Sequence, residues 1–454
     1  MHFAGTDKRQ RPAHRPVRTI TLSFAFVILV GTVVLMMPFS SRSGSFTPFF
    51  DALFTATSAT CVTGLVLYDT FLQWSAIGQA IILVLIQIGG LGLLTITTFF
   101  NLAIGRKLGL RGVHLASETA NALDLPDAPK LVKTIMLVSF SCEAVGALLL
   151  MVHFVPSYGR EGVFLSVFLA VSAFCNAGFD LLGREGAYSS LSHYNDNPYV
   201  LLVIVLLIVL GGLGFLVWKD LAQYRKTKKL LLHTRVVIVM TGALIVFGTF
   251  VFLLFEWNNG QTLGALPASQ RFVASLFQSV TTRTAGFNTI DMNSLNGVTK
   301  MFVIILMFIG AAPGSTGGGI KITTFAILVM TVVSVVRGQD ETIIFKRRVD
   351  KHVVYKALAV VLFAFMFILV ATSIIYFTSV ENIDGMNALF ESVSAFCTVG
   401  LSTGVTAVAN LPSRLMIILS MFFGRVGPVS FALALTLRQG RRHEIIPDGK
   451  IIVG

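Results

Sequence analysis

The chain has 454 residues, of which 54% are hydrophobic and only 13% charged, and its mean hydropathy is +0.80. A soluble domain of this length needs far more polar surface, so the composition favours a protein embedded in lipid. The formal net charge of +13 would suggest nucleic acid in a soluble protein. Here the basic residues lie between apolar runs, and we expect membrane lipid but no nucleic acid as a partner.

Long apolar runs recur along the chain, and a bilayer-spanning helix needs roughly 20 such residues. We therefore predict a multi-pass membrane protein with 8 transmembrane segments. The predicted spans are Ile20–Phe39, Ile77–Phe100, Leu131–Val155, Tyr199–Trp218, Val236–Trp257, Met301–Phe308 continuing at Ile320–Val336, Val353–Phe377 and Leu415–Leu437.

The basic residues give the expected orientation. Most of the 35 lysines and arginines fall at the two ends of the chain and in alternate connecting segments. Cytoplasmic loops carry an excess of lysine and arginine, so these segments are expected on the cytoplasmic side. Both termini are therefore predicted to be cytoplasmic.

Four similar segments, each ending in glycine, repeat along the chain at intervals of 114, 108 and 114 residues. Each is about 12 residues long, or about 18 Å as a helix, which is too short to cross roughly 30 Å of hydrocarbon. We expect each to enter the membrane as a half-helix and to return as an extended strand. The segments are Ala52–Gly64, Ser166–Gly178, Ala274–Gly286 and Ala388–Gly400.

The predicted fold class is an all-α membrane protein with four covalently linked helix–pore loop–helix repeats around a pseudo-fourfold pore. Four re-entrant pore helices would complete the 8 spans, since irregular backbone at membrane depth must be buried or line a wet cavity. The predicted divisions are a cytoplasmic basic segment 1–18, repeats at 19–106, 107–223, 224–340 and 341–440, and a cytoplasmic tail 441–454.

The strands around the four glycines are candidates for a K⁺ selectivity filter, in which backbone carbonyls replace the water shell of the ion. Glycine permits backbone angles forbidden to other residues and adds no side chain to a pore. A single glycine here would more often be a packing or turn residue, but four in register favour the filter. The predicted filter residues are Val62, Thr63, Gly64 and Leu65; Asn176, Ala177, Gly178 and Phe179; Thr284, Ala285, Gly286 and Phe287; and Thr398, Val399, Gly400 and Leu401.

The third copy departs from the others. Its Phe277 precedes the glycine by nine residues, where the other copies have a phenylalanine ten residues before. It also carries Arg283 where the others carry a cysteine, and we expect Arg283 to lie behind the filter wall because a cation facing the ions would oppose their binding. The cysteines Cys61, Cys175 and Cys397 are expected to be small buried residues, too far apart to form a disulfide.

The 38 residues from Thr299 to Val336 would extend about 57 Å as one helix, nearly twice the hydrocarbon thickness. Pro313 and five glycines disfavour helix in the middle of this stretch. We interpret it as an intramembrane gate loop below the filter, and a simple kink or packing notch is the alternative. The predicted loop comprises Gly310, Ala311, Ala312, Pro313, Gly314, Ser315, Thr316, Gly317, Gly318 and Gly319.

Charged residues inside predicted spans are candidates for function. Arg425 lies within the last predicted span and is interpreted as an electrostatic pore barrier that also holds the gate loop, with a snorkelling arginine as the alternative. The role of Lys321 stays open. Glu143 and Glu391 each require a hydrogen-bond or arginine partner, which the sequence does not assign.

These motifs resemble the Trk/Ktr/HKT superfamily of K⁺ transporters, and within it most closely the KtrB-type bacterial membrane subunit, from about Arg18 to the C-terminus. The first repeat starts close to the N-terminus without an extra pair of spans, which favours that type over the TrkH type. Glycine at all four filter positions implies K⁺ in the filter, because serine at the first position accompanies Na⁺ preference in plant relatives. The superfamily also carries a gating loop in the third repeat and an arginine in the last helix, which Gly310–Gly319 and Arg425 resemble.

The resemblance implies K⁺ uptake across the bacterial cytoplasmic membrane through a gated pore driven by the membrane potential. It further implies a homodimer on a cytosolic nucleotide-binding ring of RCK (KtrA-type) subunits, with possible stimulation by Na⁺. The chain has no Walker or Rossmann glycine spacing, so a nucleotide is expected only through the partner, and no covalently bound cofactor is expected.

Other functions remain as alternatives. The chain could be a TrkH-like or Na⁺-permeable member of the same superfamily, a secondary carrier or a membrane-embedded transferase. Parallel rather than inverted repeats argue against the carrier. The eight histidines form no pair at ligand spacing, which argues against an enzyme.

Overall fold

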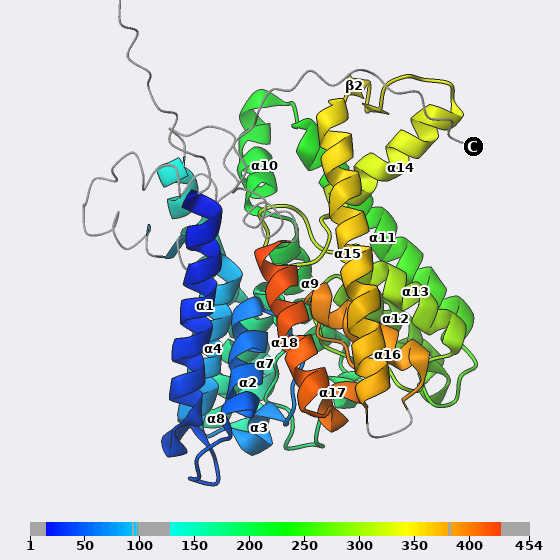
Figure 1. The fold of residues 1–454 in the computed structure, drawn as a ribbon. Helices are drawn as coiled ribbons and strands as arrows, with labels where there is room; N and C mark the ends of the chain where they lie inside the picture. Colours follow the sequence, from blue (N-terminus) through cyan, green and yellow to red (C-terminus); the bar gives the residue numbers. More distant parts are fainter. Residues whose placement is uncertain (1–14, 93–94, 97, 99–127, 380–382, 428–454) are drawn as a thin grey trace, which may run out of the picture.

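The computed structural model describes residues 15–92, 95–96, 98, 128–379 and 383–427, which are mostly helical (Figure 1). The only strands in this part form a short antiparallel hairpin in which Ile343 pairs with Arg348. The helices are α1 Arg15–Met36, α2 Phe49–Cys61, α3 Thr70–Gln73, α4 Ala76–Leu91, α7 Ala128–Tyr158, α8 Arg160–Phe174, α9 Pro198–Gly212, α10 Phe215–Thr227, α11 Leu232–Glu256, α12 Ala268–Thr281, α13 Gly297–Phe308, α14 Ile322–Val336, α15 Lys351–Thr378, α16 Gly385–Phe396, α17 Val405–Val408 and α18 Leu411–Val426. Three-residue 3₁₀ helices are η1 Pro38–Ser40, η3 Ser192–Tyr194 and η4 Leu263–Ala265, and the strands are β1 Ile343–Ile344 and β2 Arg347–Arg348.

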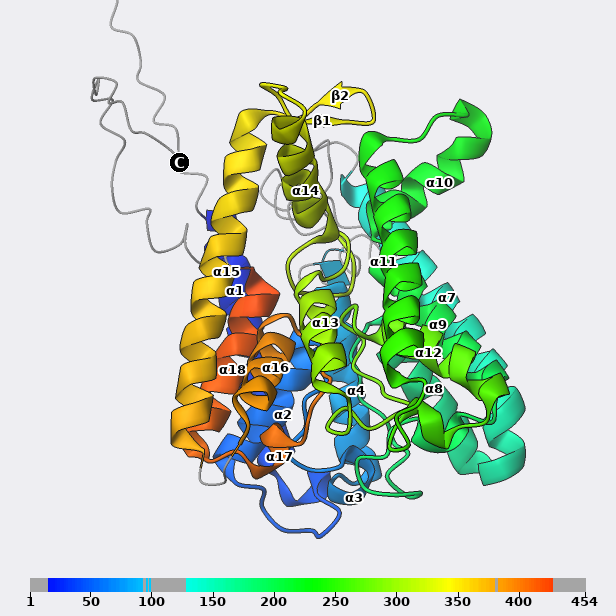
Figure 2. The same ribbon diagram turned by 90° about the vertical axis from the view of Figure 1, so that its right-hand side faces the viewer.

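A three-helix pattern recurs along the chain. A long helix is followed by a short helix, an extended segment and a third, apolar helix. The long helices are α1, α7, α11 and α15, and each packs against the short helix that follows it, which is α2, α8, α12 or α16. Figures 1 and 2 show the long helices toward the outside and the short ones further inside.

The long helices match the predicted outer spans. Four helices are long and apolar enough to cross a bilayer, at Thr19–Met36, Val132–Tyr158, Leu232–Glu256 and Lys351–Thr378. Large apolar side chains on them face outward, including Phe26 at 65% exposure and Val246 at 70%. This is the surface that lipid chains cover, and the all-α membrane fold predicted from sequence is confirmed.

The third helices differ from the prediction, because they are shorter than a full span. The predicted span Tyr199–Trp218 is not one straight helix: α9 and α10 together are long and apolar enough for a span, but they meet at an angle of 93°. Gly214 lies at this bend with φ +89°, a conformation that side chains disfavour, and it ends the straight helix.

A glycine with positive φ also follows two of the other third helices. Gly92 follows α4 with φ +83°, and Gly427 follows α18 with φ +95°. Within the predicted span Leu415–Leu437, α18 ends at Val426 and Arg425 lies in its last turn; the part of the span after Gly427 lies outside the described residues. Each of these glycines comes three residues after another glycine, a repeated pattern that the sequence reasoning missed.

The predicted break in the sixth span is present between Phe308 and Ile322, and Figure 2 shows the loop between α13 and α14. The two ends of the loop are joined by a hydrogen bond from the Gly310 amide to the Ile320 carbonyl, at 2.8 Å. The chain therefore leaves the helix and returns close to where it left.

Some predicted boundaries fall on parts that the structure does not describe. The boundary at 106/107, the tail 441–454 and most of the segment 1–18 lie outside the described residues. The boundary at 223/224 falls inside α10, and the one at 18/19 falls inside α1, so neither coincides with the end of a helix.

The first and last repeats have no chain segment joining them directly, and a buried ion pair links them instead. The Arg414 guanidinium lies 2.6 Å from the Asp51 carboxylate, although 363 residues separate the two in sequence. The Tyr68 hydroxyl donates to the second oxygen of Asp51, at 2.8 Å. Because Asp51 is in the first turn of α2 and Arg414 in that of α18, this contact fixes a short helix of one repeat to the last helix of another.

We expect Asp51→Asn to destabilise the fold by about 2 kcal/mol, less than the roughly 3–5 kcal/mol for a fully buried pair, since Arg414 keeps partial access to water. Denaturant unfolding of the purified protein in detergent would measure the loss. The control is Glu341→Gln, which removes the exposed pair with Arg348 and should change the free energy of unfolding by less than about 0.5 kcal/mol. Equal effects of the two variants would contradict a special role for the Asp51–Arg414 pair.

Candidate functional site

The four predicted filter segments meet in one ring. A methyl group added at each of the four glycines would collide with the carbonyl oxygen of the residue that precedes the next glycine. For Gly64 the oxygen is that of Ala177, at 2.5 Å, for Gly178 that of Ala285, at 2.8 Å, for Gly286 that of Val399, at 2.8 Å, and for Gly400 that of Thr63. The order returns to its starting point, so the four segments form a closed circle.

The backbone of the four segments has the same unusual conformation. The residue two before each glycine is left-handed, with φ of 58° at Val62, 59° at Asn176, 68° at Thr284 and 51° at Thr398. Each glycine also has positive φ, and the residue between does not. An alternation of this kind turns successive carbonyl oxygens toward the same side of the strand. Left-handed backbone is rare for β-branched residues, and such strain is concentrated at functional sites.

Hydroxyl groups from the short helices hold these segments. The amides of Gly64 and Gly400 donate to the hydroxyls of Ser58 and Ser394, each at 3.1 Å. In the other two repeats the hydroxyl donates to a carbonyl of the glycine segment: Ser172 to Phe179 and Thr281 to Phe287, both at 2.6 Å. The sequence analysis missed these four residues, although each comes four residues after the buried phenylalanine of its repeat.

The third copy is one residue shorter after its hydroxyl. Phe277 and Thr281 keep the usual spacing, so the missing residue lies between Thr281 and Gly286. Correspondingly, the Ala285 amide donates to a carbonyl four residues back, while in the first repeat the Thr63 amide donates five residues back. The irregular position of Phe277 is thus a shorter turn and not a different helix.

Arg283 points away from the ring. Its guanidinium is buried and donates to the Thr241 hydroxyl on α11, at 3.2 Å. This is the position behind the segment wall that the sequence predicts. Cys61, Cys175 and Cys397 are buried free thiols, also as expected.

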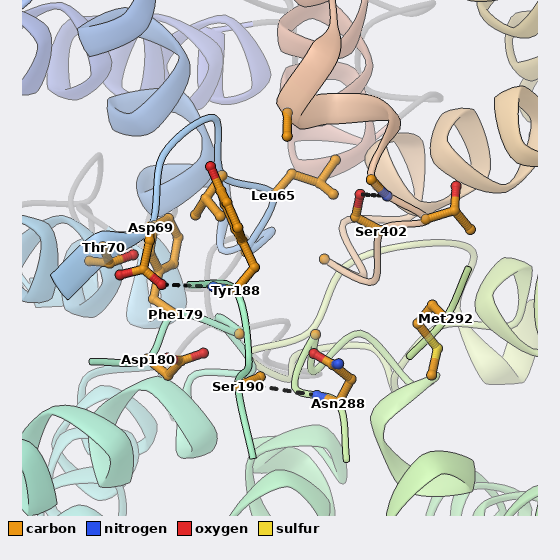
Figure 3. A pocket seen from close by; sticks show the side chains of 18 of the residues that line it. Leu65, Asp69, Thr70, Phe179, Asp180, Tyr188, Ser190, Asn288, Met292 and Ser402 are labelled. Atoms are coloured by element: carbon orange, nitrogen blue, oxygen red, sulfur yellow. Dashed lines mark hydrogen bonds between the residues drawn. The ribbon is translucent and has the colours of Figure 1, made fainter. Parts of the chain in front are cut away.

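A cavity of about 370 Å³ lies on one side of the ring (Figure 3). Asp69, Asp180 and Asp291 are among its lining residues, and carboxylates favour a cation there. Asp69 accepts hydrogen bonds from the amides of Phe71, at 2.9 Å, and Tyr188, at 3.0 Å, which hold it in place. Burial raises the pKa of the Asp180 carboxyl to about 6, and the Leu182 amide that donates to it works in the opposite direction.

The Gly310–Gly319 loop lies against the other side of the ring. A methyl group at Gly317 would collide with the Thr284 hydroxyl, and one at Gly318 with the Thr398 hydroxyl. Both hydroxyls are buried, and neither has a hydrogen-bond partner within the described part of the chain. The loop therefore sits directly beneath two of the four segments.

The loop is tied to the bend between α9 and α10. The Thr316 hydroxyl donates to the Phe174 carbonyl at the end of α8, at 2.9 Å. The Phe215 amide donates to the Gly314 carbonyl, at 2.8 Å, and the Ala312 amide to the Gly212 carbonyl, at 3.1 Å. The loop is therefore held in place by the 93° bend, which was not predicted from the sequence.

Arg425 joins the loop to the first repeat. Its guanidinium donates to the Thr316 carbonyl, at 2.5 Å, and to the carbonyls of Gly89 and Gly90 near the end of α4. Lys321, whose role the sequence left open, donates to the Gly317 carbonyl, at 2.8 Å. Both cations line a second cavity of about 470 Å³ on this side of the ring. The snorkelling interpretation of Arg425 does not fit these contacts, since the guanidinium ends on buried carbonyls.

Glu143 and Glu391 are buried and have partners that the sequence could not assign. Gln87 on α4 donates to both oxygens of Glu143, at 3.0 and 3.2 Å. Glu391 accepts from the Ser402 hydroxyl, at 2.7 Å, and from the Thr403 and Thr406 amides, at 3.2 and 3.1 Å. Glu391 therefore fixes the chain just beyond Gly400.

The chain is similar to proteins of assigned function over nearly its whole length. Residues 2–444 match the sequence model of a family described as TrkH, cation transport protein. The chain is 39% identical over 442 residues to the Ktr system potassium uptake protein B of Bacillus subtilis, with 97% of each chain covered. It is 37% identical over 452 residues to the potassium/sodium uptake protein NtpJ of Enterococcus hirae, with 98% of this chain and 99% of that protein covered.

A solved structure shares the fold. The crystal structure of the potassium transporter TrkH from Vibrio parahaemolyticus matches with a TM-score of 0.71 at 17% sequence identity. The match covers 95% of this chain and 86% of the other.

We expect Ser394→Ala to weaken K⁺ binding to the ring about fivefold, because the Gly400 amide loses an acceptor worth about 1 kcal/mol. Calorimetric titration of the purified protein with K⁺ measures the change. Ser373→Ala on the exposed face of α15 removes a similar hydroxyl from a place remote from the ring. An unchanged K⁺ affinity in Ser394→Ala would show that the Ser394 hydroxyl does not support the site.

Proposed function

This chain belongs to the TrkH cation transport family, and from this premise we propose that it takes up K⁺ through the ring of four glycine segments. It is a multi-pass membrane transporter of the Ktr/Trk type and not an enzyme, which disposes of the transferase alternative. The observation that carries the proposal is the closed circle in which each glycine faces the carbonyl oxygen of its neighbour.

The proposed selectivity filter consists of backbone carbonyl oxygens that replace the hydration shell of K⁺. The alternation of left-handed and ordinary backbone in the four segments supports this filter. Such an alternation turns carbonyl oxygens, and not side chains, to one side of each segment. The four repeats would then surround a single pseudo-fourfold pore. A Na⁺-permeable pore stays the second candidate, since one relative is named a potassium/sodium uptake protein.

The proposed gate is the Gly310–Gly319 loop together with Arg425. The loop lies beneath the ring, and three basic side chains, Lys321, Lys356 and Arg425, line the cavity on that side. Positive charges on the ion path oppose the passage of K⁺, so the loop and Arg425 would have to move for conduction. Both termini would lie in the cytoplasm. The membrane potential, which is negative on that side, would pull K⁺ inward with about 2.3 kcal/mol per 100 mV.

The proposed assembly is a homodimer on a cytosolic ring of RCK (KtrA-type) subunits. The Bacillus relative is named as part B of a Ktr system, which implies other subunits in that system. A nucleotide would act through the ring, and Na⁺ would stimulate uptake. Growth rescue of a bacterium deficient in K⁺ uptake, with and without the ring protein, tests whether the ring is required.

We expect Gly64→Ser to lower K⁺-over-Na⁺ discrimination by at least tenfold. A side chain at φ +91° would be strained and would press on the Ala177 carbonyl. Parallel K⁺ and Na⁺ uptake into proteoliposomes gives the ratio. Gly44→Ser is the matched control, because Gly44 also has positive φ but open space around it. Unaltered uptake of both ions in Gly64→Ser would contradict the assignment of this segment to the filter.

Shortening the Gly310–Gly319 loop by the residues 315–318 should raise K⁺ flux severalfold, since it removes the segment beneath the ring together with the Arg425 contact at Thr316. Arg425→Gln should raise the flux in the same direction. K⁺ flux into proteoliposomes of equal protein content measures both, with the exposed Arg347→Gln as the control. Unchanged K⁺ flux in both test variants would contradict the gate and favour the interpretation of the loop as a simple break in the helix.

A further inference from the structure

Three arginines gather on the face of the molecule that is predicted to lie outside the cell. Arg42, Arg160 and Arg184 line one cavity of about 450 Å³, together with Phe71 and Phe164. Arg42 and Phe71 come from the first repeat, and the others come from the second. This cavity is separate from the two that adjoin the ring.

The other basic residues on this face have partners within the protein. Arg271 donates to the Trp257, Gly264 and Leu266 carbonyls, Arg414 pairs with Asp51, and Lys300 donates to Asn387. Within the described part of the chain, no hydrogen bond or ion pair engages the guanidinium groups of Arg42 and Arg160. The positive charge that is not neutralised on this face therefore concentrates in one place.

An aromatic ring holds two of the arginines close together. The guanidinium carbon of Arg42 lies 4.2 Å from the centre of the Phe71 ring, and that of Arg184 lies 4.7 Å from it. Arg184 also contacts the Tyr158 ring and pairs with Glu161 at 2.8 Å. Its Nε is buried without a hydrogen-bond partner among the described residues. Like charges held this way repel one another unless an anion lies between them.

The cavity lies where a lipid headgroup would lie. It adjoins the first turns of α4 and α8, at the ends of these helices on the predicted outer face. Apolar side chains follow directly: Ile77 is 56% exposed and Val163 41% exposed. An occupant would therefore meet positive charge at one end and an apolar surface at the other.

We propose that this cavity binds the phosphate headgroup of an anionic phospholipid of the outer leaflet. The planar guanidinium groups of Arg42 and Arg160 match phosphate oxygens, and Glu161 limits the net charge. The acyl chains then run along the exposed apolar faces of α4 and α8. The proposal rests on membrane insertion and on the predicted orientation, and it is independent of which ion the ring carries.

A local fluorescence measurement tests the proposal. Trp74 lies between Phe71 and Ala76 in the sequence, and the chain has only 3 tryptophans. A Trp218→Phe, Trp257→Phe background keeps Trp74 as a single reporter. In proteoliposomes, phosphatidylglycerol with a nitroxide near its glycerol backbone should quench Trp74 more than phosphatidylcholine labelled in the same way.

Variants at the cavity give the direction of the effect. Arg42→Gln and Arg160→Gln should each lower the preference for phosphatidylglycerol about fivefold. Glu161→Gln should raise the preference, and this opposite change also guards against a trivial loss of folding. Arg347→Gln removes one positive charge from the hairpin near the other end of the molecule and should leave the preference unchanged (Figure 2).

Three results would overturn the proposal. One is equal quenching by the two lipids in the reporter protein. Another is the same loss of preference in Arg347→Gln as in Arg160→Gln. The third is displacement of phosphatidylglycerol by millimolar inorganic phosphate, which would identify a free anion as the occupant. None of these measurements involves ion transport, so their failure leaves the proposed K⁺ function untouched.

Discussion

The structure depends on one constraint: backbone from four distant segments must meet in the interior of the fold. In a membrane protein such irregular backbone is tolerated only where it is buried in protein or lines a wet cavity. Each segment satisfies this constraint in the same way, with a left-handed residue, a left-handed glycine and a hydroxyl group from the preceding short helix. Val62 and Thr398 adopt this backbone although both are β-branched. The long helices and the Asp51–Arg414 ion pair hold the short helices in positions where the four segments can meet.

The sequence predicts the features that repeat with a fixed spacing. The four glycine segments, the long outer helices and the break after Phe308 all follow from periodicity, length and glycine content. The position of Arg283 behind the segments follows from electrostatics alone. These features are local or are repeated four times, and the repeats can be compared with one another within a single sequence.

The features that escaped prediction depend on neighbours in space. Ser58 and Ser394 look like ordinary helix residues until the returning strand places an amide on each hydroxyl. Gly89, Gly211 and Gly424, near the ends of α4, α9 and α18, pack against carbonyls at the ends of short helices, where a methyl group would collide. The partners of Glu143 and Glu391 likewise come from other segments. A residue pattern alone does not show which backbone atom will approach it.

One position shows how a fourfold arrangement becomes asymmetric. The residue after the packed glycine is Gly90 in the first repeat, Gly212 in the second and Ala311 in the third, and all three are small. At Gly90 an added methyl group would collide with the Cys175 thiol. In the fourth repeat it is Arg425, whose long side chain reaches Thr316 of the third repeat and Gly89 of the first. These are the two neighbours of the fourth repeat in the ring, so one substitution in one copy ties three repeats together beneath it. A symmetric set of four small residues offers no such link, whereas this single guanidinium joins the loop to the first and the fourth repeats.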